Sequence, residues 1–426
     1  MTYRLCYYSM IARSVPGTIL AMPLKDIANI LLIRGGRPIM RIACIHQGYE
    51  LYGSDRSFVE SVESLRLLYP SAEIEVVLPR DGPITELLRD VATRIVFEPL
   101  WILRRKALPR LLTVDLARLP VAVMRAIRRL RGFDLVYVNT SIIIDYAIAA
   151  RFVGNKAVLH IHEIPEGLAL KVLRALMRWS RAEIIFNSNA TRLAFDLPAT
   201  MRSSVIYNGV AGPAEAQPMT YDGQRRLRVL MLGRVNRIKG QEVLLEAISM
   251  MDAAWQARID IRMVGSAFEN DEPEQALKAQ IAQMKLGQQV SMLPFTDDPS
   301  EHYRWADIVV VPSRRPESLG RVAIEAMAYG RPPVVSAIGG LMEVVEHQRT
   351  GWLVPPADPA ALAAQLQAIA SEPDLWRGFV ENGRLRYESM FSHSASTKAI
   401  AALVSARHQK AVVLTGALDK PGTCET

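Results

Sequence analysis

Two glutamates eight residues apart, Glu317 and Glu325, mark the segment best suited to chemistry. A buried strand over 308–312 is predicted to lead through a polar loop into a helix over about 320–329. If that helix continued back to Glu317, the carboxylates would lie about 80° apart around its axis and about 12 Å apart along it. Such a pair could hydrogen-bond two hydroxyl-bearing parts of one elongated ligand. The apolar neighbours of Glu325 favour this interpretation over acidic residues that only serve the helix dipole, because an unpartnered carboxylate there is costly.

The start of this helix adds an expected anion site between the two glutamates. Backbone N–H groups near Leu319, Gly320 and Arg321 have no acceptor within a helix that begins there, and they point toward a place where an anion could bind. The implied ligand carries hydroxyl groups at both ends and negative charge in the middle. A nucleoside diphosphate sugar fits that description.

A basic loop, Leu232-Gly-Arg-Val-Asn-Arg-Ile-Lys-Gly-Gln, follows a second predicted strand over 227–233. Arg234 and Lys239 are expected at the carboxyl end of that strand. A diphosphate needs fixed cations, and it needs them more as a leaving group, when its charge develops. A solvated basic loop would explain either residue alone, but the flanking glycines and the glutamate segment favour phosphate ligands.

His162 follows a predicted strand over 156–161 and is expected to face a cleft. A neutral imidazole, or the backbone carbonyl of His162, could hydrogen-bond a sugar hydroxyl and orient the reacting carbon. His160, two residues earlier, is expected on the same face of the sheet. The alternative is that His160 is a hydrogen-bonded partner of His162 there.

The loop over 47–57 follows the first predicted strand and contributes Gly53, Ser54 and Asp55 as candidate residues. Ser54 or Asp55 could cap a helix that begins near Ser57. The loop lacks the Gly-x-Gly-x-x-Gly pattern, so a dinucleotide site is not predicted.

These residues require parallel sheets to position them, and the sequence predicts two. From residue 40 onward, short β-branched runs alternate with segments of helical length, as in parallel sheets wound with helices. A Gly-, Pro- and polar-rich segment over 211–226 separates the two series. We therefore predict an α/β fold with two facing Rossmann-like domains and a ligand cleft at the carboxyl ends of the strands. The predicted strands span 40–46, 73–78, 93–97, 134–138, 156–161, 183–187 and 203–206, then 227–233, 258–264, 290–293, 308–312, 333–336 and 352–354.

The predicted boundaries place one Rossmann-like domain after another. Residues 1–39 show no clean signal-peptide order, and Met40 opens the first predicted strand, so we expect residues 1–39 to be an extension or an upstream start and exclude them from the fold. The remaining parts are a first domain over 40–212, a linker over 213–226, a second domain over 227–385, a helical segment over 386–410 that returns to the first domain, and a tail over 411–426.

The net charge of +8 on 426 residues could indicate a nucleic acid, a membrane surface or an anionic substrate as the partner. The distribution of the charge along the chain narrows this choice. Nine basic residues and one acidic residue lie between Leu100 and Gly132, an excess equal to that of the whole chain. Interleaved apolar residues make this stretch suitable for an anionic membrane surface; the alternative is a solvated helix that packs on its domain. No aromatic-basic platform supports a nucleic-acid partner. The hydrophobic half of the composition excludes a disordered chain, and three cysteines form neither a metal-ligand pattern nor a disulfide framework.

From Met40 to about residue 405, the sequence resembles the retaining glycosyltransferases of family 4, which have the GT-B fold. The marker is the Glu317/Glu325 pair within a run like Glu-x-x-Gly-x-x-x-x-Glu-Ala-Met-Ala-x-Gly-x-Pro-Val-Val, with Pro333 as a departure. Two shorter matches are Asn-Gly-Val at 208–210 and Gly-Gly-x-x-Glu at 339–343.

The resemblance implies that the first domain binds the acceptor and the second the nucleotide sugar, and it implies a role for each candidate residue. Glu317 would contact sugar hydroxyls of the donor, Glu325 the ribose, and Arg234 and Lys239 the diphosphate. The backbone at Gly320 and Arg321 would assist, His162 would lie near the reacting sugar, and the loop with Gly53, Ser54 and Asp55 would lie beside the acceptor.

The implied reaction is hexosyl transfer with retention, through an oxocarbenium-like ion pair in which the departing phosphate helps deprotonate the acceptor. The chain has no Asp-x-Asp motif, so we expect neither a metal requirement nor a cofactor. The expected setting is bacterial surface-polysaccharide biosynthesis, in the cytoplasm and peripheral to the inner face of the membrane. The alternatives are a nucleotide-sugar epimerase of the same fold and a non-catalytic binding protein. Donor base, sugar, acceptor, linkage and oligomeric state do not follow from the sequence.

Overall fold

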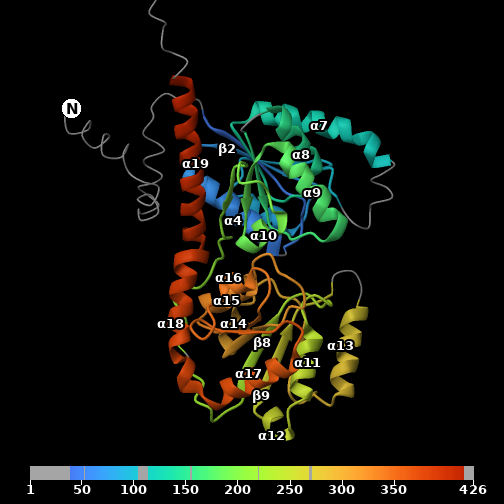
Figure 1. The fold of residues 1–426 in the computed structure, drawn as a ribbon, viewed down its shortest axis with the longest axis vertical. Coiled ribbons are helices and arrows are strands. Elements are labelled where there is room, and N and C mark those ends of the chain that lie inside the picture. The colour runs from blue at the N-terminus through green and yellow to red at the C-terminus, as the bar shows by residue number, and fades with distance from the viewer. Residues whose placement is uncertain are drawn as a thin grey trace, which may run out of the picture.

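The computed structural model describes residues 39–51, 53–103, 114–153, 156–218, 220–267 and 271–416, which form two α/β domains stacked end to end (Figure 1). The first domain holds a seven-stranded parallel sheet, in the order β3-β2-β1-β4-β5-β6-β7. Its strands are β1 (Arg41–Ile45), β2 (Glu73–Leu78), β3 (Arg94–Phe97), β4 (Leu135–Val138), β5 (Ala157–Ile161), β6 (Glu183–Phe186) and β7 (Ser203–Val205).

The second domain holds a six-stranded parallel sheet, in the order β10-β9-β8-β11-β12-β13. Its strands are β8 (Leu227–Leu232), β9 (Ile259–Val264), β10 (Val290–Leu293), β11 (Ile308–Val311), β12 (Pro333–Ser336) and β13 (Trp352–Val354). The predicted fold class and every predicted strand are confirmed, with strand ends within one residue. Central strands such as β11 and β12 are buried throughout, which explains their unbroken apolar runs.

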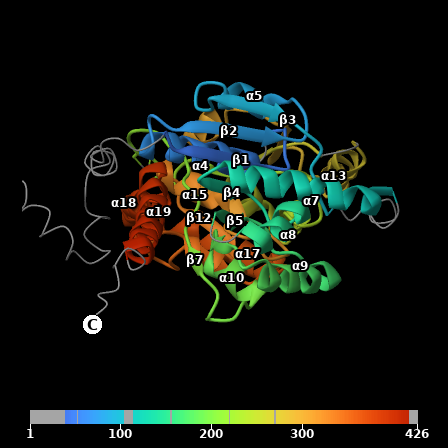
Figure 2. The same ribbon diagram turned by 90° about the horizontal axis from the view of Figure 1, so that it is seen from above.

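Helices cover both faces of the first sheet and build a separate core on each (Figure 2). One core is formed with α7 (Val114–Gly132), α8 (Ile144–Val153) and α9 (Gly167–Ser180), and the other with α4 (Gly53–Leu68), α5 (Pro83–Leu88) and α19 (His393–Gly416). The short helix α10 (Asn189–Phe195) is capped by Ser188, whose hydroxyl accepts a hydrogen bond from the Thr191 amide.

The helices of the second domain include α11 (Gln241–Ser249), α15 (Arg321–Ala328) and α16 (Leu341–Val344). The others are α12 (Ala253–Gln256), α13 (Glu272–Gln283), α14 (Ser300–Trp305), α17 (Pro359–Ser371) and α18 (Arg377–Arg386), with a 3₁₀ turn at Pro373–Trp376 and a π-helical turn at Tyr387–Phe391. Three helical elements follow one another between Pro359 and Arg386, because Pro373 interrupts the α-helical hydrogen bonding.

The long helix α19 leaves the second domain and packs along the first (Figure 1). Ile400, Ala401 and Val404 are buried in the same core as α4, and the hydroxyls of Ser64 and Thr397 lie 2.8 Å apart. The helix continues to Gly416, so the first part of the predicted 411–426 tail is helical. Residues 1–38 of the predicted extension and 417–426 of the tail lie outside the described residues.

The basic stretch over 100–132 is described only in part, since 104–113 fall outside the described residues. Its helix, α7, packs Ala126 and Leu130 against the sheet and leaves Leu116, Val121 and Met124 exposed. Arg129 is not available to a membrane surface, contrary to the prediction for the whole stretch, because it is largely buried and ion-paired with Glu75 and Glu98. No helix in the described part of the chain is long and apolar enough to cross a membrane.

Candidate functional site

A cavity of about 600 Å³ lies between the domains, at the carboxyl ends of both sheets. Nine of the ten predicted site residues line it: Gly53, Ser54, His162, Arg234, Lys239, Glu317, Gly320, Arg321 and Glu325. Asp55 does not line it. The cavity is lined by the segments that follow β1, β5, β6 and β7 of the first domain and β8, β9, β10 and β11 of the second, as the rule for parallel sheets predicts.

Lys239 and Glu317 form an ion pair in the wall of the cavity. The Lys239 Nζ donates to Glu317 Oε1 at 2.8 Å, and the Ser313 hydroxyl donates to the same oxygen. Burial alone would raise the pKa of Glu317, but the Lys239 ammonium and the two hydrogen bonds outweigh it and lower that pKa below its ordinary value. Glu317 is therefore an ionised acceptor at neutral pH, and Lys239 is held beside it.

Glu317 does not continue the helix of Glu325, so the extrapolated helical spacing of the two carboxylates is wrong. The helix α15 begins at Arg321, and its N-cap Gly320 has φ +104°, a left-handed conformation that breaks the helical path. The backbone of Glu317 instead pairs with Gly339 in an isolated parallel bridge. A Cβ at Gly320 would also lie 2.4 Å from Leu341 Cδ2, so glycine is required both for its φ and for packing on α16.

Gly240 brings the basic loop onto the end of β11. It is the N-cap of α11 with φ +77°, and a Cβ there would lie 2.1 Å from the carbonyl oxygen of Pro312. This close backbone approach sets Lys239 within reach of Glu317. Arg234 lines the same cavity, and its carbonyl accepts a hydrogen bond from Gln241 Nε2 at 2.8 Å.

Glu325 is held by two neighbours rather than left open to solvent. Arg321 Nε donates to Glu325 Oε1 at 2.7 Å, and the Tyr303 hydroxyl donates to Oε2 at 2.6 Å. Burial and the Glu325 carboxylate raise the pKa of Tyr303 well above its usual range, so this phenol remains a donor. The Arg321 side chain, expected near the anion site, points instead to Glu325 and to Glu60 of α4, so its backbone alone remains available to a diphosphate.

His162 lines the cavity, and both of its ring nitrogens are buried. Within the described part of the chain, neither of its ring nitrogens has a hydrogen-bond partner, although the side chain is about nine-tenths buried. Burial, with smaller contributions from His160 and His46, lowers the pKa of His162 well below its ordinary value, and the neighbouring Asn208 amide only partly opposes this. The imidazole is therefore neutral at physiological pH and able to donate or accept one hydrogen bond at each nitrogen. His160 lies in the core, where its Nδ1 meets the Tyr137 hydroxyl.

The loop after β1 differs from the prediction in its helix start. The helix α4 begins at Gly53, so Ser54 and Asp55 lie in its first turn and are not caps of a helix that starts near Ser57. Asp55 is 4% exposed, and its Oδ1 lies 2.8 Å from His46 Nε2. Asp55 is thus a buried support of the loop.

Sequence reasoning missed Arg56, which also lines the cavity. Its Nη2 donates to the carbonyl oxygen of Asp297 in the second domain at 2.7 Å. The signal was present, because Arg56 lies in the first turn of the helix that follows β1, at the same sheet edge as the predicted residues.

Glu343, matched by resemblance alone, joins the two domains. Its carboxylate accepts hydrogen bonds from the Asn189 amide at 2.8 Å, the Ala190 amide at 2.6 Å and the Tyr207 hydroxyl at 3.0 Å. The two domains are therefore in direct contact through this carboxylate.

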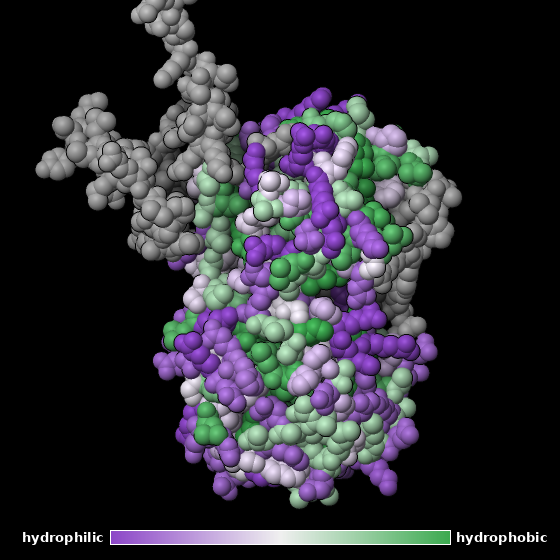
Figure 3. All heavy atoms as spheres, viewed as in Figure 1, coloured by the Kyte–Doolittle hydropathy of each residue, from purple (hydrophilic) through white to green (hydrophobic). Residues whose placement is uncertain are grey.

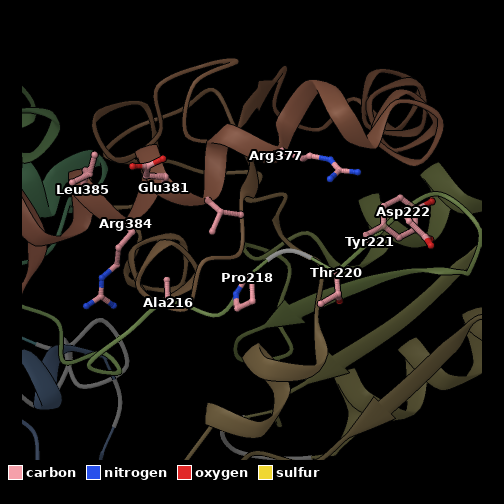
Figure 4. Close-up of a pocket in the computed structure, with 10 residues that line it drawn as sticks. Ala216, Pro218, Thr220, Tyr221, Asp222, Arg377, Glu381, Arg384 and Leu385 are labelled. Carbon is pink, nitrogen blue, oxygen red and sulfur yellow. The ribbon is translucent and has the colours of Figure 1, made fainter.

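A second hollow, of about 570 Å³, lies between the interdomain segment and α18, and its labelled residues come from these two segments (Figure 4). Arg384 at its edge donates to Glu388 and to the carbonyl oxygens of Pro213, Ala214 and Ala328. This arginine therefore fastens the interdomain segment to α18. Among the described residues, no group of three or more His, Cys, Asp or Glu side chains could hold a metal ion.

Comparison with known proteins assigns the second domain to a family. Residues 222–386 match the model described as Glycosyl transferases group 1. The D-inositol 3-phosphate glycosyltransferase of Geodermatophilus obscurus is 33% identical over 184 residues, which are 42% of this chain and 40% of that protein. A relative of the same description from Catenulispora acidiphila is 36% identical over 152 residues, 34% of this chain and 36% of that protein. These matches therefore cover about two-fifths, or less, of the length of each of these curated relatives.

Solved structures match over most of the chain. Anabaena Alr3699/HepE in complex with UDP has a TM-score of 0.71 at 23% identity, over 86% of this chain and all of that one. The apo form of the lipopolysaccharide outer core galactosyltransferase WaaB has a TM-score of 0.68 at 15% identity, over 86% of this chain and 99% of that one. The chain therefore has the GT-B fold, and its residues 222–386 form a glycosyl transferases group 1 domain.

Proposed function

We propose that this chain is a retaining glycosyltransferase that moves a sugar from a nucleotide-sugar donor to a glycan or lipid-linked acceptor. The observation that carries the proposal is the convergence of Glu317, Glu325, Lys239 and the α15 start on one interdomain cavity. Separate carboxylates suit hydroxyls at the two ends of a donor, and the cation and amides suit the diphosphate between them. The group 1 domain supports this proposal, as do the Anabaena structures in complex with UDP and UDP-glucose.

In the proposed reaction, each cleft residue acts on a different part of the donor. Glu325 binds the ribose, Glu317 accepts hydrogen bonds from sugar hydroxyls, and neutral His162 hydrogen-bonds the sugar near the reacting carbon. As the bond from the anomeric carbon to the phosphate oxygen breaks, Lys239 and Arg234 stabilise the charge that develops on the leaving phosphate. That phosphate takes the acceptor proton on the same face, which retains the configuration without a protein nucleophile. We propose that these cations make a metal unnecessary.

Binding and product analysis test this proposal directly. A thermal-shift screen with UDP, GDP, ADP and their sugars is expected to show stabilisation by one base, because a ligand of the native state raises apparent stability. With that donor and an acceptor, the product anomer measured by NMR is expected to match the donor anomer, in EDTA as in buffer. Glu325→Gln is expected to abolish transfer with unchanged circular dichroism. Near-normal transfer by this variant would refute the site assignment, and loss of activity in EDTA would refute metal independence.

The epimerase alternative predicts a different product in the same assay. Incubation with donor alone would yield an isomerised sugar nucleotide, with no acceptor consumed. We expect hydrolysis at most under these conditions. Binding of a sugar nucleotide without turnover across an acceptor panel would instead favour the non-catalytic alternative.

We further propose that the acceptor domain lies on an anionic membrane surface at the cytoplasmic face, where surface polysaccharides are built. In addition to the exposed apolar side chains of α7, the structure shows a stripe on α9 in which Leu168, Val172 and Trp179 are 74%, 48% and 44% exposed. Lys171 and Arg178 flank this stripe, and no acidic residue lies on α9. Apolar and hydrophilic side chains interleave over this half of the molecule in Figure 3. Such a face suits anionic lipid by burial and by charge.

Vesicle flotation tests the membrane proposal. The full chain is expected to float with phosphatidylglycerol vesicles, to float less at high salt, and not to float with phosphatidylcholine alone. Lys171→Glu with Arg178→Glu is expected to reduce flotation, whereas Lys278→Glu with Lys285→Glu, the same change of charge on exposed residues of the second domain, is the matched control. Equal flotation of both variants would refute a role for α9.

A further inference from the structure

We propose that Glu60, on α4 of the first domain, is a positioning residue for the carboxylate of Glu325 and acts through Arg321. The inference rests on the proposed donor site at Glu325. Glu60 does not line the cavity, and no motif in the sequence singles it out. Its contact with Arg321 is an ion pair across the domain boundary.

One guanidinium holds two carboxylates from different domains. Arg321 Nη1 and Nη2 donate to the two oxygens of Glu60 at 3.0 Å and 2.8 Å, and Nε donates to Glu325 Oε1 at 2.7 Å. The two-pronged contact with Glu60 fixes the plane of the guanidinium, and the direction of Nε–H follows from that plane. Glu60 thereby determines where the Glu325 carboxylate is held.

The three side chains of this contact are largely buried. The side chains of Glu60, Arg321 and Glu325 are 11%, 19% and 16% exposed, so their interactions are weakly screened by solvent. Burial alone would lower the pKa of Arg321, but Glu60 and Glu325 together raise it, which keeps the guanidinium charged. Without Glu60, Arg321 would lose its first-domain partner and be free to take both oxygens of Glu325 in its own two-pronged contact.

Glu325 keeps capacity for a ligand while it is held in this way. Arg321 occupies one lone pair on Oε1 and Tyr303 one on Oε2, and a carboxylate offers about two acceptor positions on each oxygen. A ribose with two neighbouring hydroxyls can therefore bind a carboxylate that is already oriented. A two-pronged Arg321–Glu325 contact would occupy the positions that the ribose needs.

Donor binding and the contact between the domains are thereby linked. The Glu60–Arg321 pair exists only when the domains are juxtaposed, and it prepares Glu325 for the ribose. By thermodynamic reciprocity, a donor that prefers the prepared Glu325 also favours the juxtaposed domains. A simple tether would join the domains without changing how Glu325 binds.

A double-mutant cycle on the full chain separates positioning from tethering. Calorimetry measures the Kd of UDP, GDP and ADP for wild type, Glu60→Gln, Glu325→Gln and the double variant. Glu60→Gln is expected to weaken binding of the preferred nucleotide by about 10-fold, within the usual range for coupled sites. The same substitution is expected to change the Kd less than about two-fold in the Glu325→Gln background, because Arg321 then has no carboxylate to position.

Controls and kinetics complete the test. Glu63→Gln removes a neighbouring carboxylate of α4 that is 40% exposed and lies 3.9 Å from His393, and it is expected to leave the Kd unchanged. Glu60→Gln is expected to raise the donor KM more than it lowers kcat, and Glu60→Asp, which keeps the charge, is expected to be intermediate and serves if Glu60→Gln does not fold. Independent effects of Glu60→Gln and Glu325→Gln, or an unchanged Kd in Glu60→Gln, would overturn the proposal. Failure of the wild type to bind any of the three nucleotides would instead refute the donor site.

Discussion

The two walls of the cleft differ in charge and in hydrogen bonding. In the wall from the second domain, the carboxylates of Glu317 and Glu325 have cationic partners at 2.8 Å and 2.7 Å, from Lys239 and Arg321. In the wall from the first domain, His162 is neutral and has polar atoms without partners among the described residues. A wall of balanced charges can receive an anion by exchanging partners, whereas unpaired buried polar atoms gain a hydrogen bond from any hydroxyl that reaches them. The comparison indicates that the charged half of a donor belongs to the second wall and its neutral sugar to both.

The strongest test of this comparison is Lys239→Ala. We expect transfer to fall by about 10²–10³-fold, the usual cost of removing one group that stabilises developing charge. Glu317 would also lose the cation that keeps its pKa low. The control is Arg314→Ala, which removes an exposed cation paired with Glu242 on the same domain. Similar turnover in both variants would show that net charge, not the placement of Lys239, serves the reaction.

The two neighbouring histidines offer a second test within the first wall. His162→Ala is expected to lower kcat/KM by about 10-fold, one hydrogen bond to substrate, with little change in the free energy of unfolding. His160→Ala is expected to cost about 2 kcal/mol in urea denaturation, because it opens the core beside Tyr137. If His160→Ala impaired turnover more than His162→Ala at equal stability, the assignment of the cavity-facing imidazole would be reversed.

Substitution of one glycine in each wall tests whether the backbone is more constrained in the second domain than in the first. Gly240→Ala is expected to destabilise the fold by about 1–2 kcal/mol from its left-handed φ alone, with the close Pro312 carbonyl adding to this. Gly53→Ala is expected to be neutral or slightly stabilising, since its Cβ would meet only Arg321 Cδ at 3.9 Å. Urea denaturation measures both, and equal destabilisation would contradict the difference in backbone constraint.

The pH dependence of stability is the smallest expected effect. Burial lowers the pKa of His160 to about 3 and that of His162 well below 6.5, so the unfolded chain binds more protons as the pH falls below 6.5. Stability is therefore expected to be nearly flat from pH 7 to 8 and to decline below 6.5. His162→Asn is expected to reduce the slope by up to about 1.4 kcal/mol per pH unit, the contribution of one proton. An unchanged slope would contradict a neutral, buried imidazole.

Glu317 contributes in the same direction at lower pH. Its pKa is lowered from 4.5 in the folded chain, so its stabilisation is complete above 4.5 and is lost as the pH falls further. Glu317→Gln is expected to remove this part of the acid sensitivity and leave the decline between pH 6.5 and 5 intact.

The fold was predictable from the sequence because parallel strands buried on both faces leave unbroken apolar runs between turn residues. The same rule placed the site, since strand ends converge at one sheet edge, and it correctly grouped Lys239 with Glu317, which line one cavity. The exact positions of Glu317 and Asp55 were not predicted, because they depend on the direction of the backbone over a few residues. The left-handed Gly320 separates Glu317 from the helix of Glu325, and α4 begins early enough to place Asp55 behind the loop.

Contacts between the domains were beyond sequence reasoning for a different reason. Glu60 and Arg321 are 261 residues apart, and Glu343 meets Asn189 across 154 residues. Helical periodicity predicts which face of its helix Glu60 occupies. It does not predict the partner of Glu60, because that depends on the relative orientation of the two domains. Arg56 shows the intermediate case, where the sheet edge was predictable and the role across the cleft was not.

The return of α19 to the first domain means that the chain crosses between the domains twice. The Val210 amide donates to the Phe391 carbonyl at 2.8 Å, and Val210 forms a parallel bridge with Ser392, so the outgoing and returning segments lie side by side. Two adjacent covalent crossings limit how far one domain can slide or twist against the other. The residues of the two domains that face each other across the cleft are thereby kept opposite the same partners.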